Sequence, residues 1–167
     1  MTVFCCWLDT GTNNSAIDPR YNAYEAFRLS EGIDVVNSTI YFVSKNQRRL
    51  YILDTENGTF ECSSTESGAF NNAPDQIQAI IDDPDGIVYF CEDGGSDCGV
   101  HGRDRTGQFF SILDGPGYNT ETTGLAFTED HKIMFVSFQG EGVIWQFWRE
   151  DGYPFNGPKL DIKYHAN

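Results

Sequence analysis

A repeat of about 46 residues constrains this chain more than any other feature of its sequence. Three apolar runs, rich in β-branched and aromatic residues, begin 47 and 46 residues apart: Ile40–Val43, Ile87–Phe90 and Ile133–Val136. A second strand-like piece led by an acid precedes each run, and these pieces are Glu31–Val35, Asp75–Ala79 and Glu121–Phe127. Self-similarity at a period of about 20–50 residues is typical of repeat architectures. We therefore expect three copies of one structural unit.

Each unit also contains two later strand candidates. The third candidates are Arg49–Leu53, Gly99–Arg103 and Val143–Phe147. A turn follows each of them, at Glu56–Gly58, Arg105–Gly107 and Glu150–Gly152, and leads into a fourth short strand such as Gln108–Ile112. Four strands in about 45 residues is the period of a β-propeller blade. Helical periodicity is nearly absent, with one short helix or turn predicted at 19–28. The sequence therefore predicts an all-β fold, a partial β-propeller of about three four-stranded antiparallel blades.

The length of 167 residues favours a single domain. We expect a non-repetitive lead-in at 1–28 and blades at about 29–70, 71–116 and 117–160. Closed propellers typically have about 4–8 blades. Three blades are therefore expected to be a fragment, a half completed by a second chain, or an open array packed on a partner.

The charge balance narrows the classes of partner. With 25 acidic and 11 basic side chains, the formal net charge is −14, which disfavours attraction to nucleic acid or anionic lipid. No apolar run approaches the roughly 18 residues of a membrane span, and the opening residues lack the pattern of a signal peptide. The five cysteines fit neither a zinc spacing nor a complete set of pairs. Cys91 and Cys98 are either a disulfide or two buried thiols.

The acids that lead the first strand of each unit are the main candidate ligands. Glu31, Asp75 and Glu121 are separated by 44 and 46 residues. First strands line the channel of a propeller, so these carboxylates would face one another near its axis. Gathered carboxylates repel, and a bound divalent ion removes that penalty. Ligation by oxygen alone indicates Ca²⁺ or Mg²⁺. The alternative is that each acid caps a turn or pairs with a neighbouring blade.

Further polar candidates lie in the second unit. The segment Glu92–Asp97 joins acids to glycines that permit tight folding, so it is either an ion-binding loop or an ordinary acidic turn. His101 could act as acid, base or ligand, and Arg103 or Arg105 could bind a phosphate by a bidentate contact. The alternative for all three is placement on the surface. No motif of a serine hydrolase, nucleotide-binding protein or thiol protease is present.

An ordered series of motifs resembles the carboxy-terminal half of the PhoX-type alkaline phosphatases. The resemblance covers roughly residues 25–150 and comprises Leu29–Asp34 with Tyr41–Ser44, Ala73–Ile77, Asp85–Gly94, His101–Arg103, Glu121–Phe127 and Met134–Gly140. It implies a six-bladed propeller whose axial cavity holds calcium and iron ions and hydrolyses phosphate monoesters. It also implies that Glu31, Asp75, Glu92 and Glu121 fall on metal-ligand positions, and it favours an extracytoplasmic or secreted location. The family's amino-terminal half, which supplies further ligands including a cysteine to iron, has no counterpart here.

Two functions of different classes follow. The first is a calcium-dependent phosphomonoesterase, acting on a phosphate monoester once the missing blades or a second chain supply the rest of the site. The alternative is a non-catalytic partial propeller that serves as a structural or binding subunit of a larger assembly. Lactonase-like or sugar-binding chemistry is a third reading, because other calcium propellers also open their first strands with acids.

Overall fold

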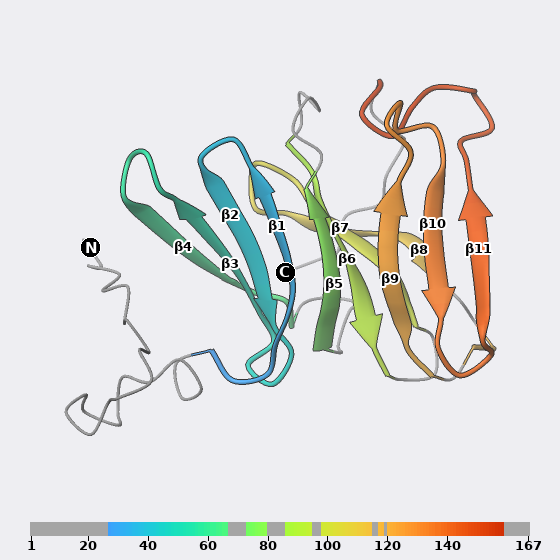
Figure 1. Cartoon of the computed structure of the whole chain (residues 1–167), viewed down its shortest axis with the longest axis horizontal. Helices are drawn as coiled ribbons and strands as arrows, with labels where there is room; N and C mark the ends of the chain where they lie inside the picture. The colour runs from blue at the N-terminus through green and yellow to red at the C-terminus, as the bar shows by residue number, and fades with distance from the viewer. Residues whose placement is uncertain are drawn as a thin grey trace.

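The computed structural model describes residues 27–66, 73–79, 86–94, 98–114, 117–118 and 120–158. Within these ranges the chain contains eleven strands in three antiparallel sheets and no helix. Figure 1 shows the sheets side by side in the order of the sequence. The all-β prediction is therefore confirmed. Of the short helix or turn predicted at 19–28, all but residues 27 and 28 lie outside the described ranges.

Each sheet is a meander in which consecutive strands pair. The first sheet contains β1 (Ser30–Val36), β2 (Thr39–Ser44), β3 (Arg49–Asp54) and β4 (Thr59–Ser64). The second contains β5 (Ala73–Ala79), β6 (Val88–Asp93), β7 (Gly99–Arg103) and β8 (Phe109–Asp114). The third contains β9 (Thr122–Phe127), β10 (Met134–Phe138) and β11 (Val143–Phe147). The apolar runs predicted from the repeat are thus the second strands β2, β6 and β10.

The predicted fourth strand of the third unit is absent from the described residues, which reach 158. The predicted turn is present, because Gly152 at φ 73° donates its N–H to Arg149 O. Beyond it, buried Arg149 donates to the carbonyl oxygens of Pro154 and Pro158 and folds the segment back on itself. The segment therefore does not pair with β11. Its Phe155 enters the core instead, beside Tyr89 of β6.

The second sheet is covered on both faces by its neighbours. Along β6, Val88 and Phe90 pack towards the first sheet, whereas Tyr89 and Cys91 pack towards the third. Because successive side chains of a strand point to opposite faces, both faces must be apolar when both are buried. This explains why β6 is a continuous apolar run. The packing also places β5 between β1 and β9, so that the first strands of the three sheets are neighbours.

No helix in the described part of the chain is long and apolar enough to cross a membrane.

Candidate functional site

A group of acids gathers at the end of the sheets where β5 begins. Asp75, near the start of β5, is 2% exposed. The side chain of Glu121, which directly precedes β9, is 18% exposed. Asp93 ends β6, which runs antiparallel to β5 and therefore returns to the same end. We call Asp75, Asp93 and Glu121 the acid cluster. The repeat predicted the proximity of Asp75 and Glu121, and the structure brings these two carboxylates together.

The acid cluster is neutralised in two ways. First, Lys45 Nζ lies 2.8 Å from Asp93 Oδ2 and 3.7 Å from Glu121 Oε1. Second, burial, a hydrogen bond with Asp75 and the charge of Asp93 raise the pKa of Glu121 from 4.5 to about 7. A hydrogen bond between two carboxyl groups requires that one of them carry a proton. At pH values below about 7, the cluster therefore holds an ammonium group and the proton of Glu121 among three acids.

The electrostatics of Lys45 agree with this arrangement. Burial acts to lower the pKa of Lys45, but the hydrogen bond to Asp93 and the charges of Asp93, Glu121 and Asp75 together raise it. The ammonium form is thus held firmly by the acids around it. All three acids act on this one cation, which marks their end of the sheets as a place where positive charge is stabilised.

Lys45 was not predicted as a site residue, although its position carries a signal. Lys45 follows β2 directly, and its N–H donates to Leu29 O at 2.9 Å. Gln139 follows β10 in the same way and donates to Glu121 O at 2.9 Å. In the first and third sheets, the residue after the second strand is thus hydrogen-bonded to the residue just before the first strand. A repeat alignment extended by two residues would have placed Lys45 beside the leading acids.

The other two predicted ligands lie elsewhere. Glu31 is exposed on β1, and no hydrogen bond or ion pair joins its carboxylate to another described residue. β1 carries a β-bulge between Ser30 and Ile33, so the regular alternation of side chains is broken at Glu31, whereas Asp34 beyond the bulge accepts the Ala79 N–H of β5. The chain therefore does not bring Glu31 into the acid cluster, and its predicted role as a ligand stays a prediction.

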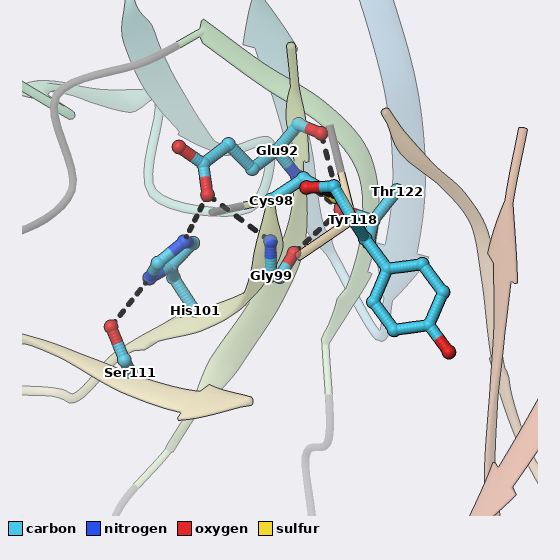
Figure 2. A network of polar contacts seen from close by, with 7 residues as sticks. All are labelled: Glu92, Cys98, Gly99, His101, Ser111, Tyr118 and Thr122. Carbon is cyan, nitrogen blue, oxygen red and sulfur yellow. Dashed lines mark hydrogen bonds and ion pairs between the residues drawn. The ribbon is translucent and has the colours of Figure 1, made fainter. Parts of the chain in front are cut away.

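Glu92 belongs to a separate, buried network (Figure 2). Its Oε2 atom accepts the Gly99 N–H at 3.2 Å and lies 2.9 Å from His101 Nε2. The other ring nitrogen, His101 Nδ1, lies 2.8 Å from Ser111 Oγ. The Gly99 N–H and the His101 ring thus meet at one carboxylate oxygen of Glu92. Exposures of 3% for Glu92 and 4% for His101 close this network to solvent.

Thr122 ties the same network to the third sheet (Figure 2). Its hydroxyl oxygen accepts the Glu92 N–H at 2.9 Å, and the hydroxyl donates to Gly99 O at 2.6 Å. Cys98 Sγ lies 3.6 Å from Tyr118 O. The arrangement satisfies buried polar groups between the second and third sheets, which is what a structural network must do. Glu92 stays a predicted ligand that the structure does not place beside the acid cluster.

The remaining candidates of the second unit are divided between core and pocket. Arg103 is buried rather than on the surface, whereas Arg105 is exposed in the turn after β7. Cys91 and Cys98 are buried free thiols, which is the second of the two alternatives, and burial raises the pKa of both. Of the acidic loop at 92–97, residues 95–97 lie outside the described ranges, as do Cys5 and Cys6.

The acid cluster offers only oxygen atoms, the donors that Ca²⁺ prefers. As the side chains stand, no three His, Cys, Asp or Glu residues among those described converge closely enough to ligate one ion. Lys45 explains this spacing, because its ammonium group lies between Asp93 and Glu121. The oxygen donors of the acid cluster therefore fit a hard cation, and in the present arrangement the carboxylates are spaced to hold the Lys45 ammonium group.

Comparison with known proteins gives no identification: no protein-family model matches the chain, and no curated protein is significantly similar to it. The fold and the site define an all-β protein of three packed antiparallel sheets with clustered carboxylates at one end.

Proposed function

We propose that the three sheets are blades of a β-propeller and that the chain is part of a PhoX-like, calcium-dependent phosphomonoesterase. The observation that carries this proposal is the gathering of Asp75, Asp93 and Glu121 around Lys45, at the end of the sheets where β5 and β9 begin and β6 ends. Three acids drawn from two sheets are costly to gather unless a cation binds there. Among the predicted ligands, Asp75 and Glu121 support the proposal directly, and Asp93 joins them from the end of β6.

The residues of the cluster are suited to exchange one cation for another. Asp75 and Glu121 would hold Ca²⁺ after Glu121 loses its proton, and Asp93 would join them as Lys45 withdraws. A bound calcium ion supplies charge that binds phosphoryl oxygens and stabilises charge developing in the transition state. Lys45, released from the acids, would offer its ammonium group to the same phosphoryl oxygens. Iron is expected only where the rest of the site is supplied.

A phosphatase assay with matched variants tests this function. The chain is mixed with Ca²⁺ and a chromogenic phosphate monoester, alone and together with an amino-terminal half of the PhoX type and iron. Calcium-dependent phosphate release that Asp75→Asn and Glu121→Gln abolish supports the proposal. Glu129→Gln, which changes the charge of an exposed acid outside the cluster, serves as the control and retains activity. Absence of phosphate release under all these conditions contradicts a phosphatase.

The alternative function is a non-catalytic partial propeller that serves as a structural or binding subunit. Exposed apolar side chains at both ends of the array favour it: Ile33 and Val35 on β1, and Ile144, Trp145 and Trp148 on or after β11. Exposed apolar patches and strand edges commonly mark surfaces that another protein covers. Under this alternative, further blades or a second chain pack against these ends.

Light scattering over a range of concentrations tests the alternative. A particle larger than the single chain, which returns to monomer when Val35→Lys or Ile144→Lys is introduced, supports a subunit role. A monomer that stays soluble at high concentration and co-purifies with no partner contradicts it. The two functions are separable, because neither variant touches the acid cluster.

A further inference from the structure

A pocket of about 240 Å³ lies between the first and second sheets, away from the acid cluster. One wall is a cross-strand row of the first sheet, formed by Tyr41, Ile52 and Glu61. The facing wall is a row of the second sheet, formed by Ala79, Val88 and Arg103. Residues paired across antiparallel strands point to the same face, so each row presents its side chains together. Ala79 lies four residues beyond Asp75, or about 13 Å along β5.

Two arginines bring positive charge to this pocket. Arg103 ends β7 and Arg105 follows it by two residues, and both line the cavity. The Arg105 guanidinium packs over Gly86: a Cβ atom at that glycine would lie 3.0 Å from Arg105 Nε. The turn is fixed by Asp104, whose Oδ1 accepts the N–H groups of Thr106 and Gln108. The end of β7 therefore positions Arg103, and a well-defined turn positions Arg105.

Arg103 is the deepest charged group of the pocket. Its side chain is 7% exposed, and its Nη2 contacts the carboxylate of Glu61. Its Nε has no hydrogen-bond partner among the described residues. A buried N–H donor without an acceptor destabilises the protein, and a charged donor more so. The single carboxylate of Glu61, which is itself more than half exposed, leaves this requirement unmet.

Tyr41 adds a hydroxyl group to the same wall. Burial raises the pKa of Tyr41, although a hydrogen bond with Thr39 and the charges of Arg103 and Arg105 act to lower it. The phenol therefore stays protonated at neutral pH and can donate a hydrogen bond. The residues that carry two guanidinium groups and a hydroxyl, on β2, β7 and the turn after β7, thus line one cavity.

We propose that this pocket is a binding site for a small tetrahedral oxyanion, of which inorganic phosphate is the probe of choice. Guanidinium groups match such anions with paired hydrogen bonds. The volume is below the range of about 300–1,000 Å³ typical of sites for larger organic ligands, so a nucleotide or similar cofactor is too large. Glu61 acts as the internal counter-ion of Arg103 until the anion binds. The site is separate from the proposed metal site, and each can exist without the other.

Calorimetric titration of the full chain with low-millimolar phosphate, in EDTA and at constant ionic strength, tests the proposal. Phosphate and sulfate are expected to bind, whereas acetate and chloride are not. Arg105→Gln, at an exposed position, is expected to weaken phosphate binding about tenfold or more. Glu61→Gln is expected to strengthen it, because the variant frees Arg103 from its carboxylate. Lys132→Gln, which removes an equal charge from an exposed turn of the third sheet, is the control and leaves binding unchanged.

Three results at the pocket, and a fourth at the acid cluster, would overturn the proposal. The first is no phosphate binding by the wild-type chain. The second is equal binding by wild type and Arg105→Gln, which would place the anion elsewhere. The third is unchanged or weaker binding by Glu61→Gln, which would make Arg103 and Glu61 a purely structural ion pair. Glu121→Gln must bind phosphate like wild type in EDTA. Loss of binding in that variant alone would assign phosphate to the acid cluster instead and would leave the proposed function standing.

Discussion

Glu92 and Glu121 are both acids at the same end of the packed sheets, but their surroundings differ. Glu92 is the more deeply buried, and its carboxylate meets the Gly99 N–H and the His101 ring. Glu121 is more exposed, yet it faces Asp75 and Asp93 with Lys45 as the nearby cation. The comparison teaches that the neighbours of a carboxylate, rather than its degree of burial, decide its role. A carboxylate that meets hydrogen-bond donors belongs to a closed structural network, whereas one that meets other acids belongs to a site that can accept a cation.

The largest effect is expected from breaking the closed network. Glu92→Ala removes the acceptor of Gly99 and His101 and leaves both buried groups without their partner. Each buried donor or acceptor left unsatisfied costs about 1–3 kcal/mol. Urea denaturation should therefore show a fall of this size in the free energy of unfolding. Glu92→Gln is expected to lose less, because its amide oxygen can still accept the Gly99 N–H.

Glu129→Ala provides the matched control, since it removes an exposed glutamate from the third sheet. Its effect should lie within about 0.5 kcal/mol. A loss below about 1 kcal/mol for Glu92→Ala would contradict the view that this network is structural.

The second effect is a pH dependence that Glu121 imposes on stability. Its pKa is about 7 in the folded chain and 4.5 when unperturbed, so the folded state keeps a proton that the unfolded state loses between these values. Stability must therefore fall as pH rises from 4.5 to 7. The fall is at most about 3 kcal/mol at roughly 1.4 kcal/mol per pH unit.

Thermal melts of wild type and Glu121→Gln in EDTA between pH 5 and pH 8 measure this dependence. The variant is expected to match wild type near pH 5 and to be more stable at pH 8, because its amide cannot ionise. The difference between the two proteins isolates Glu121 from histidines that titrate over the same range. A difference that does not change with pH would rule out the raised pKa of Glu121.

The third effect comes from removing the cation. Lys45→Gln removes the ammonium group from a cluster whose acids are mostly ionised at pH 8, so stability at that pH should fall by about 1–2 kcal/mol. The loss should be smaller at high salt, because dissolved ions screen the remaining repulsion. In the double variant with Glu121→Gln, the loss should be smaller again. Additive losses would show that Lys45 and Glu121 do not interact.

The smallest effect is expected at Glu31. Because its carboxylate is exposed on β1 and apart from the acid cluster, Glu31→Gln should change stability by less than about 0.5 kcal/mol from pH 5 to pH 8. Thermal melts run beside those of Glu121→Gln provide the measurement. A pH-dependent gain like that of Glu121→Gln would show that Glu31 joins the cluster in solution.

The repeat in the sequence was sufficient to predict most of the strands. The apolar runs at 40–43, 87–90 and 133–136 identify β2, β6 and β10, because buried strands need continuous apolar faces. The prediction of a fourth strand in the third unit was wrong for a local reason. Arg149 donates hydrogen bonds to the carbonyl groups of Pro154 and Pro158 and turns the segment inwards. A strand pattern does not reveal that a buried arginine will compete for the backbone.

The site was only partly predictable for a different reason. Repeat phase brought Asp75 and Glu121 to one level, and the structure agrees. Adjacent acids such as Glu92 and Asp93 point to opposite faces of β6, and spacing alone does not say which face meets the cluster. Glu31 shares the repeat phase of Asp75, but it lies in a β-bulge of β1 and its side chain is exposed. The position of a residue in the repeat therefore predicts where along the strands its side chain lies, but not which face of the sheet the side chain occupies.

The most direct test of the central claim is calcium binding by the acid cluster. Thermal melts at pH 8, in EDTA and then with millimolar Ca²⁺, compare wild type with Glu121→Gln. An ion that binds only the folded state raises the melting temperature by mass action. The account predicts a clear rise for wild type, which Glu121→Gln reduces or abolishes. No rise for wild type, or an equal rise for both proteins, would contradict the assignment of Asp75, Asp93 and Glu121 as a cation site.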